Sequence, residues 1–215
     1  MDIGYIVIVL IVVLLSMMLH ELMHGFIALK LGDDTARLMG RLSFNPLKHV
    51  DPFMTVGLPL LIVISNMLSG ANMPIFGGAK PVPFNPANLR NDWSVALVAG
   101  AGPLVNLILA FIFYGVWVSV GMPATGLWGT ILNTVVWVNL GFFAFNILPI
   151  PPLDGSRVIY ALAPDFVRRG MDIVERYGII IVLAIVLLFN NLLFQYMGGL
   201  IVGLLTMFGR VFGVS

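Results

Sequence analysis

The chain has no cysteine, few charged side chains and only three histidines among its 215 residues. Without cysteine it can form no disulfide, no thiolate nucleophile and no metal site built on sulfur. Charged residues make up 10% of the chain, whereas a soluble domain typically carries about 25%. Hydrophobic residues make up 60%, which indicates a membrane protein. No basic run is long enough to follow a phosphate backbone, so we expect no nucleic-acid partner.

Apart from Asp2, Glu21 and Arg210, the charged residues are gathered in three polar blocks, at 30–51, 80–92 and 154–176. Between the second and third blocks, residues 93–153 carry no charge and no histidine. Because a spanning helix needs about 20 apolar residues, this run predicts two helices, separated by a turn at 121–126 that contains Gly and Pro. With apolar runs also near each end of the chain, we expect an all-α polytopic membrane protein with four to six transmembrane helices.

Lysine and arginine occupy the three polar blocks and are absent from the turn at 121–126. The positive-inside rule therefore places all three blocks on the cytoplasmic side. On that topology the segment 53–79 enters and leaves the membrane by the same face, so we expect a re-entrant segment beside protein or a watery cavity. It also brings His20 and Asp154 to a similar depth near the cytoplasmic side.

His20, Glu21 and His24 form the pattern HExxH inside an otherwise apolar run. Ionisable groups are costly in hydrocarbon and usually have a function there. On a helix, residues four apart share a face, so the two imidazoles can bind one metal ion while Glu21 lies beside it and takes a proton from an activated water. The alternative interpretation is a buried group of histidines and acid that are only hydrogen-bonded to one another.

A catalytic zinc site usually has three protein ligands and one open position, so a third ligand must come from elsewhere. The candidates at a matching depth are His49, Asp51 and Asp154. Asp154 ends the stretch NILPIPPLD, in which prolines terminate a helix. It could instead cap a helix that begins near Ser156. The spacing supports the metal ligand and the helix cap equally.

An HExxH pattern in an early membrane helix, followed by NILPIPPLDG at 146–155, resembles the site-2 proteases, which are intramembrane zinc metalloproteases. The second motif of that family, an Asn followed by prolines and Leu-Asp-Gly, maps onto Asn146 and Asp154. The stretch AGAGPLVN also resembles the family's Gly-Pro-x-x-Asn element, which maps onto Asn106. The chain is similar to a compact prokaryotic branch without PDZ or CBS domains, which implies a single integral-membrane protease domain over 1–215.

The resemblance implies one Zn²⁺ per chain, held by His20, His24 and Asp154, with Glu21 as the general base. It further implies a multi-pass protein of a prokaryotic plasma membrane, with its active site near the cytoplasmic side. The implied substrate is a membrane protein or peptide that is cleaved in or near its transmembrane segment, as in regulated intramembrane proteolysis.

Asparagines in the apolar runs are further candidates, because each amide must find hydrogen-bond partners in the membrane. The resemblance suggests that Asn106 and Asn146 bind the substrate backbone or stabilise the oxyanion; the alternative is hydrogen bonding between helices. For Asn133 and Asn139 we expect only that second role. His49 is interpreted as a loop or interfacial residue.

Two other classes of function use the same ligands without hydrolysis, namely a metal-binding membrane transporter and a catalytically inactive scaffold. Transporters often contain internal repeats around a site at the membrane midplane, and no paired repeat is visible here. A transporter also has no need for Glu21 directly after the first histidine. The complete set of His20, Glu21, His24 and Asp154 argues against a scaffold. The sequence does not indicate an oligomeric state.

Overall fold

The computed structural model describes residues 3–57, 64 and 79–214, and every structural statement below concerns these residues. They form helices and connecting segments, with no β-strand among them. The long helices are α1 (Ile3–Lys30), α4 (Asp92–Ser119), α5 (Gly126–Asn146) and α9 (Asn190–Phe212). The shorter ones are α2 (Thr35–Leu38), η1 (Pro46–His49), η2 (Pro52–Gly57), η3 (Pro86–Asn88), α6 (Asp154–Leu162), α7 (Asp165–Arg176) and α8 (Gly178–Leu188).

Four helices in the described part of the chain are long and apolar enough to cross a bilayer. They are α1, α4, α5 and residues 191–212 of α9, with lengths of 28, 28, 21 and 22 residues. The expected all-helical polytopic membrane fold is therefore confirmed, with four spans as the lower end of the expected range. The re-entrant segment expected around 53–79 falls largely on 58–63 and 65–78, which lie outside the described residues.

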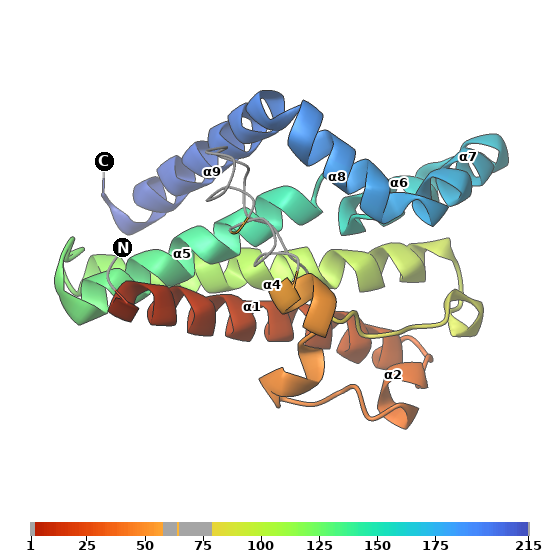
Figure 1. The fold of residues 1–215 in the computed structure, drawn as a ribbon, viewed down its shortest axis with the longest axis horizontal. Helices are drawn as coiled ribbons and strands as arrows, with labels where there is room; N and C mark the ends of the chain where they lie inside the picture. Colours follow the sequence, from red (N-terminus) through yellow and green to blue (C-terminus); the bar gives the residue numbers. More distant parts are fainter. Residues whose placement is uncertain (1–2, 58–63, 65–78, 215) are drawn as a thin grey trace.

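Helices α1, α4 and α5 lie side by side and form the body of the molecule (Figure 1). The end of α1 packs against the beginning of α4, where Ala28 meets Val95 and Val98, so these two helices are antiparallel. A short turn reverses the chain between α4 and α5. Both chain termini lie at the same end of the molecule (Figure 1).

The second half of the chain continues from α5 through α6 and α7 and returns along α8 and α9 (Figure 1). The end of α9 packs on α4, where Phe208 and Phe212 contact Phe111 and Tyr114. The polar helices α2 and α7 lie at the end of the molecule opposite the two termini (Figure 1). Charged and apolar residues therefore separate along the long axis of the bundle.

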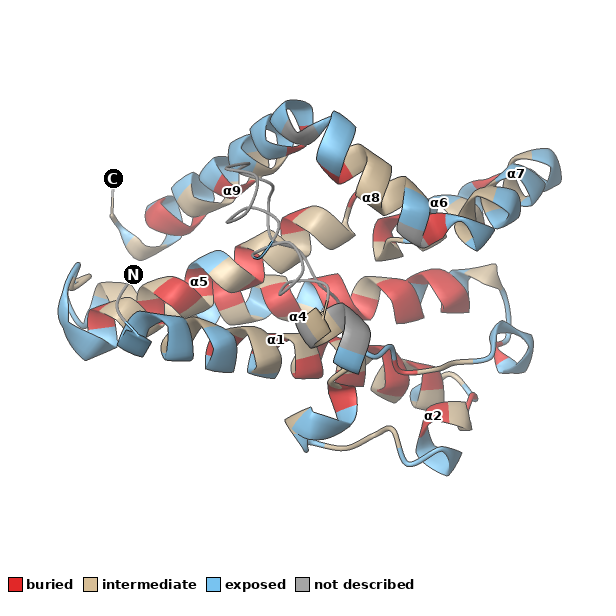
Figure 2. Ribbon diagram, viewed as in Figure 1, coloured by how far each residue is buried: buried red, intermediate tan, exposed pale blue. Residues whose placement is uncertain are grey.

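The limits of α4 and α5 follow from local chemistry. Asn91 caps α4, because its side-chain oxygen accepts a hydrogen bond from the Ser94 backbone N–H at 2.9 Å. Helix α5 ends at Asn146, three residues before the first of the prolines that exclude further helix. Buried residues are concentrated on the half of α4 that follows Asn91 (Figure 2). This half of α4 lines the candidate site.

Candidate active site

Side chains from two distant parts of the sequence converge between α1 and the start of α6. His20 Nε2 and His24 Nε2 are 3.0 Å apart on one face of α1. Asp154 Oδ2 lies 3.1 Å from His20 Nε2 and 3.4 Å from His24 Nε2. The two imidazoles are buried and the carboxylate is 22% exposed. The structure thus brings together the two histidines of the HExxH pattern and one of the three candidate third ligands.

Asp154 reaches this position because the chain turns sharply after α5. Asp154 is the first residue of α6, and no side-chain hydrogen bond caps this helix. The carboxylate therefore faces the histidines instead of the helix end. Gly155 allows the turn, since a Cβ at this position would overlap the backbone carbonyl of Ile147. Asp154 therefore does not cap α6, and its role as a metal ligand stays a prediction.

The second nitrogen of each imidazole is held by a neighbouring helix. His24 Nδ1 donates to the backbone carbonyl of Val98 at 2.7 Å, and His20 Nδ1 lies 2.6 Å from Asn106 Oδ1. Because a carbonyl can only accept, the neutral His24 carries its proton on Nδ1 and has a lone pair on Nε2. Metal-binding histidines in proteins are usually oriented in this way through their outer nitrogen.

The cluster has the composition and dimensions of a zinc site. Tetrahedral coordination with bonds of about 2.0–2.1 Å separates neighbouring ligand atoms by about 3.3 Å. The three separations found here are 3.0, 3.1 and 3.4 Å. Asp154 Oδ2 is buried and has no hydrogen-bond partner among the described residues. An ion bound between the three side chains would give this oxygen a partner, and two nitrogens and one oxygen are ligands that suit Zn²⁺.

Gly102 of α4 faces the same cluster. A Cβ at this position would lie 2.6 Å from His20 Nε2 and closer still to His24 Nε2. Real Cβ atoms do not approach other atoms this closely, so a larger residue would have to displace the imidazoles. Gly102 is the glycine of the Gly-Pro-x-x-Asn element that ends at Asn106, but the resemblance assigned a role only to the asparagine.

Glu21 lies between the two histidines in the sequence and is half-buried. Its Oε2 accepts a hydrogen bond from the backbone N–H of Val82 at 2.8 Å. Val82 is buried in the segment 79–85, which has no regular secondary structure and packs along α1. The contact with Val82 has no signal in the sequence, because every residue except proline offers a backbone N–H.

The asparagines predicted to bind substrate occupy different environments. Asn106 is 0% exposed, and its Nδ2 donates to Asn139 Oδ1 at 2.8 Å while its Oδ1 faces His20. Asn146 is half-buried at the end of α5, where its Nδ2 donates to the carbonyl of Phe142 at 3.0 Å. Substrate binding by either residue stays a prediction. The hydrogen bonding between helices that we expected of Asn139 is confirmed.

His49 and Asp51 do not belong to the His20–His24–Asp154 cluster. His49 is buried in η1, and its Nε2 donates to the backbone carbonyl of Ser43 at 2.8 Å. The loop interpretation of His49 therefore agrees with its position after α2. Of the three candidate third ligands, Asp154 alone approaches the two histidines within the part of the chain that the structure describes.

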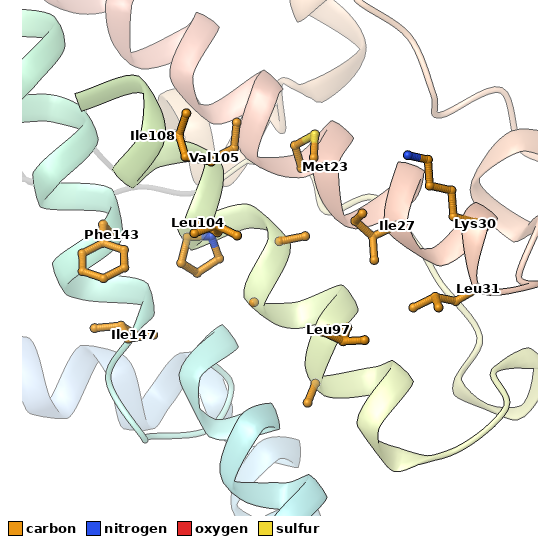
Figure 3. A pocket seen from close by; sticks show the side chains of 14 residues that line it. Met23, Ile27, Lys30, Leu31, Leu97, Leu104, Val105, Ile108, Phe143 and Ile147 are labelled. Atoms are coloured by element: carbon orange, nitrogen blue, oxygen red, sulfur yellow. The ribbon is translucent and has the colours of Figure 1, made fainter. Parts of the chain in front are cut away.

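An apolar cavity of about 560 Å³ lies against the same parts of α1 and α4 (Figure 3). Met23 and Ile27 line it from α1, Leu97 and Leu104 from α4, and Phe143 from α5. Lys30 is the charged residue in its lining. The cavity thus offers an apolar environment next to the helix turns that carry the histidines.

Comparison with known proteins supports a particular enzyme class for this site. The family model described as Peptidase family M50 matches residues 8–127 and 118–189. The chain belongs to peptidase family M50, the family of the site-2 proteases. No solved structure matches the chain.

Two relatives from bacteria are both named "Putative zinc metalloprotease". YwhC of Bacillus subtilis is 42% identical over 189 residues, which are 84% of this chain and 79% of YwhC. Rip2 of Mycolicibacterium smegmatis is 30% identical over 197 residues, which are 86% of this chain and 68% of Rip2. Together with the family match, these relatives identify the chain as a zinc-dependent metalloprotease of the membrane. The recognition of the family from its two motifs is confirmed.

Proposed function

We propose that this M50 peptidase hydrolyses a peptide bond in or near the transmembrane segment of a membrane-protein substrate. His20, His24 and Asp154 hold one zinc ion, and Glu21 is the general base. The observation that carries the proposal is the buried cluster of two imidazoles and one carboxylate between helices long enough to span a bilayer. Residues 1–215 act in this proposal as a single integral-membrane protease domain.

Glu21 moves the protons of the reaction. When bound, zinc supplies Lewis-acid activation of the attacking water and of the scissile carbonyl. The Glu21 carboxylate accepts the proton of that water and later donates it to the nitrogen of the leaving amine. The backbone N–H of Val82 orients the carboxylate through Oε2, so the segment 79–85 contributes to the site. The low exposure of His20 and His24 keeps bulk water away from the reacting groups.

Apolar surroundings support a substrate from within the membrane. The cavity beside α1 is lined almost entirely by apolar side chains, so it suits the apolar residues of a transmembrane segment. A substrate helix hides its carbonyls in its own hydrogen bonds, and it must therefore unwind locally before hydrolysis. Asn146 is half-buried at the end of α5, and we assign it the contact with the unwound substrate backbone.

The active site in this proposal lies near the cytoplasmic face of a prokaryotic plasma membrane. His20 and His24 lie in the second half of α1, towards the end of the molecule that carries α2 and α7 (Figure 1). Arginines are frequent at that end, as the positive-inside rule requires of a cytoplasmic face. A site at this depth gives water a short path to the scissile bond.

Zinc content and proteolysis, measured together in detergent-purified protein, test the proposal. We expect one zinc per native chain, weak zinc binding in Asp154→Ala, and unchanged zinc in Glu21→Gln. Cleavage of an apolar transmembrane peptide should fall by about 10²–10⁴-fold in Glu21→Gln, which is the usual contribution of a general base. Asp51→Ala, an acid outside the cluster, serves as the matched control for both measurements.

Each outcome separates one part of the proposal from the others. Full activity in Glu21→Gln would refute its role as the base. Zinc that survives Asp154→Ala would refute the ligand set. A native protein that cleaves soluble unfolded chains as fast as transmembrane peptides would refute the intramembrane substrate, while leaving the metalloprotease assignment intact.

A further inference from the structure

A closed path of buried hydrogen bonds leaves α1, crosses α5 and α4, and returns to α1 at the zinc site. Asn139 Nδ2 donates to Ser16 Oγ at 2.9 Å, and Asn106 Nδ2 donates to Asn139 Oδ1 at 2.8 Å. Asn106 Oδ1 then lies 2.6 Å from His20 Nδ1. All four residues are buried, and both asparagines are 0% exposed. We call Ser16, Asn139, Asn106 and His20 the amide relay.

One backbone carbonyl determines the orientation of both side-chain amides in the amide relay. Asn139 Nδ2 also lies 2.8 Å from the carbonyl oxygen of Val135, which can only accept a hydrogen bond. The NH₂ group of Asn139 must therefore point to Val135, which turns its Oδ1 towards Asn106. That oxygen requires the NH₂ group of Asn106, so Asn106 presents Oδ1 to His20. An oxygen facing His20 Nδ1 requires the imidazole proton on that nitrogen.

We propose that Asn139 is a positioning residue of the zinc site, which acts through Asn106 to hold His20 in the tautomer whose Nε2 lone pair faces the metal. This inference rests on the proposed role of His20 as a zinc ligand. His24 is oriented directly by the backbone carbonyl of Val98, whereas His20 is oriented by the side-chain amide of Asn106. A carbonyl orients an imidazole in one step. A side-chain amide can rotate and offer either end, so Asn106 needs a second group to hold its orientation.

Loss of Asn139 predicts a defined chemical defect. In Asn139→Leu the amide of Asn106 has no partner that sets its direction, and its NH₂ group is free to face His20 Nδ1. That arrangement selects the tautomer with the proton on Nε2, the nitrogen that should bind zinc. We expect zinc affinity to fall by about 10- to 100-fold, the usual effect of removing a partner of a metal-binding histidine.

A second substitution distinguishes a positioning role of Asn139 from a role in helix packing alone. Adding Asn106→Asp to Asn139→Leu places a carboxylate oxygen before His20 whichever way the group is turned, so zinc affinity should recover. Asn133→Leu makes the same exchange on α5 outside the relay, and is the matched control. Helix content, measured by circular dichroism, identifies any variant that fails to fold.

Zinc titration of these detergent-purified variants decides the proposal. Native affinity in Asn139→Leu would overturn it, as would a folded double variant that remains as weak as Asn139→Leu. Nitrogen-15 shifts of the histidines in the zinc-bound native protein test it without any variant, and we expect a proton on His20 Nδ1 and zinc on Nε2. The reverse pattern would overturn the relay even if Asn139→Leu does not fold.

His20→Ala separates failure of the relay from failure of the proposed function. If zinc survives His20→Ala, the ligand set is refuted and the relay with it. If zinc is lost there but unaffected by Asn139→Leu, the relay alone is refuted and the proposed protease site stands.

Discussion

The two halves of helix α4 have different neighbours, because the first half lies against the histidines of α1 and the second half packs on α9. Residues 92–106 contain most of the glycine and alanine of α4, and they include Gly102, which faces the imidazoles, and Asn106, which contacts His20. Residues 107–119 carry large aromatic side chains that pack on α9, with the rings of Phe111 and Phe208 5.1 Å apart. The first half requires a residue without a side chain next to the imidazoles, and it makes directed hydrogen bonds to them. The second depends on bulk, because helices in a membrane associate through close packing.

Among the substitutions that compare the two halves of α4, Gly102→Ala should have the largest effect on zinc binding and activity. In Gly102→Ala the new methyl group would overlap both Nε2 atoms, so the imidazoles must move away from the metal. A displacement of this size costs about 100-fold in activity, and zinc occupancy should fall with it. Metal analysis and peptide cleavage measure both effects.

Gly100→Ala provides the control for this prediction. It lies two residues away on the same helix, and a Cβ there meets nothing within 4 Å. We expect native zinc content. Equal loss of zinc in Gly100→Ala and Gly102→Ala would show that any alanine in this half of α4 is harmful. It would contradict the specific role of Gly102 beside the imidazoles.

Removing bulk from the aromatic half should reduce stability and leave the zinc site intact. Phe208 is 1% exposed and contacts Phe111 and Tyr114, so Phe208→Ala leaves a void that neighbouring rings fill only in part. We expect the free energy of unfolding to fall by about 3 kcal/mol. Denaturation in detergent measures the loss. Zinc binding per folded molecule should equal that of the native chain, and a selective loss of zinc would contradict the division between the halves.

Asp33 anchors the loop before α4 to the end of α1, next to the half that carries the site. Burial raises the pKa of Asp33, but hydrogen bonds from Thr35, Asn88 and the Asn85 backbone outweigh it and lower the pKa below its ordinary value of 3.8. The carboxylate therefore stabilises the fold above pH 3.8, and this contribution disappears as the pH falls through the lowered pKa.

Asp33→Asn tests that contribution. We expect the substitution to cost about 2 kcal/mol near neutral pH, since hydrogen bonds to a charged group are lost. The difference in unfolding free energy between native and variant protein should shrink on acidification. A difference that does not change down to pH values well below the ordinary pKa would contradict the assignment.

The smallest effect is expected from glycine in the aromatic half. A Cβ in Gly115→Ala would lie 2.5 Å from Cζ of Phe212, which is the far end of a flexible side chain. The ring can rotate away, so we expect a change in unfolding free energy below about 1 kcal/mol and no change in zinc content. Thermal unfolding in detergent provides the measurement. A large effect here would show that the aromatic half is as intolerant of added atoms as the half beside His20.

The parts of the site that could be predicted are those with a local pattern. The HExxH pattern predicts that His20 and His24 share a helix face, because four residues complete about one helical turn. The spacing around Asp154 supports a metal ligand and a helix cap equally, and only the resemblance to the site-2 proteases favours the ligand. The contacts of Val98, Val82 and Gly102 could not be predicted. Each depends on how closely α4 or the segment 79–85 approaches α1, and any sequence offers carbonyls and N–H groups everywhere.

The sequence by itself determined the membrane class, the presence of long apolar helices, and the residue types that suit zinc. These properties follow from composition and helical periodicity, which act over short distances along the chain. The tertiary structure alone decided which asparagine contacts which histidine. Asn106 and Asn139 are 33 positions apart, and they meet only because α4 and α5 pack in one rotation about their axes. Hydrogen bonds are directional over about 3 Å, so their partners are determined by packing and not by spacing in the sequence.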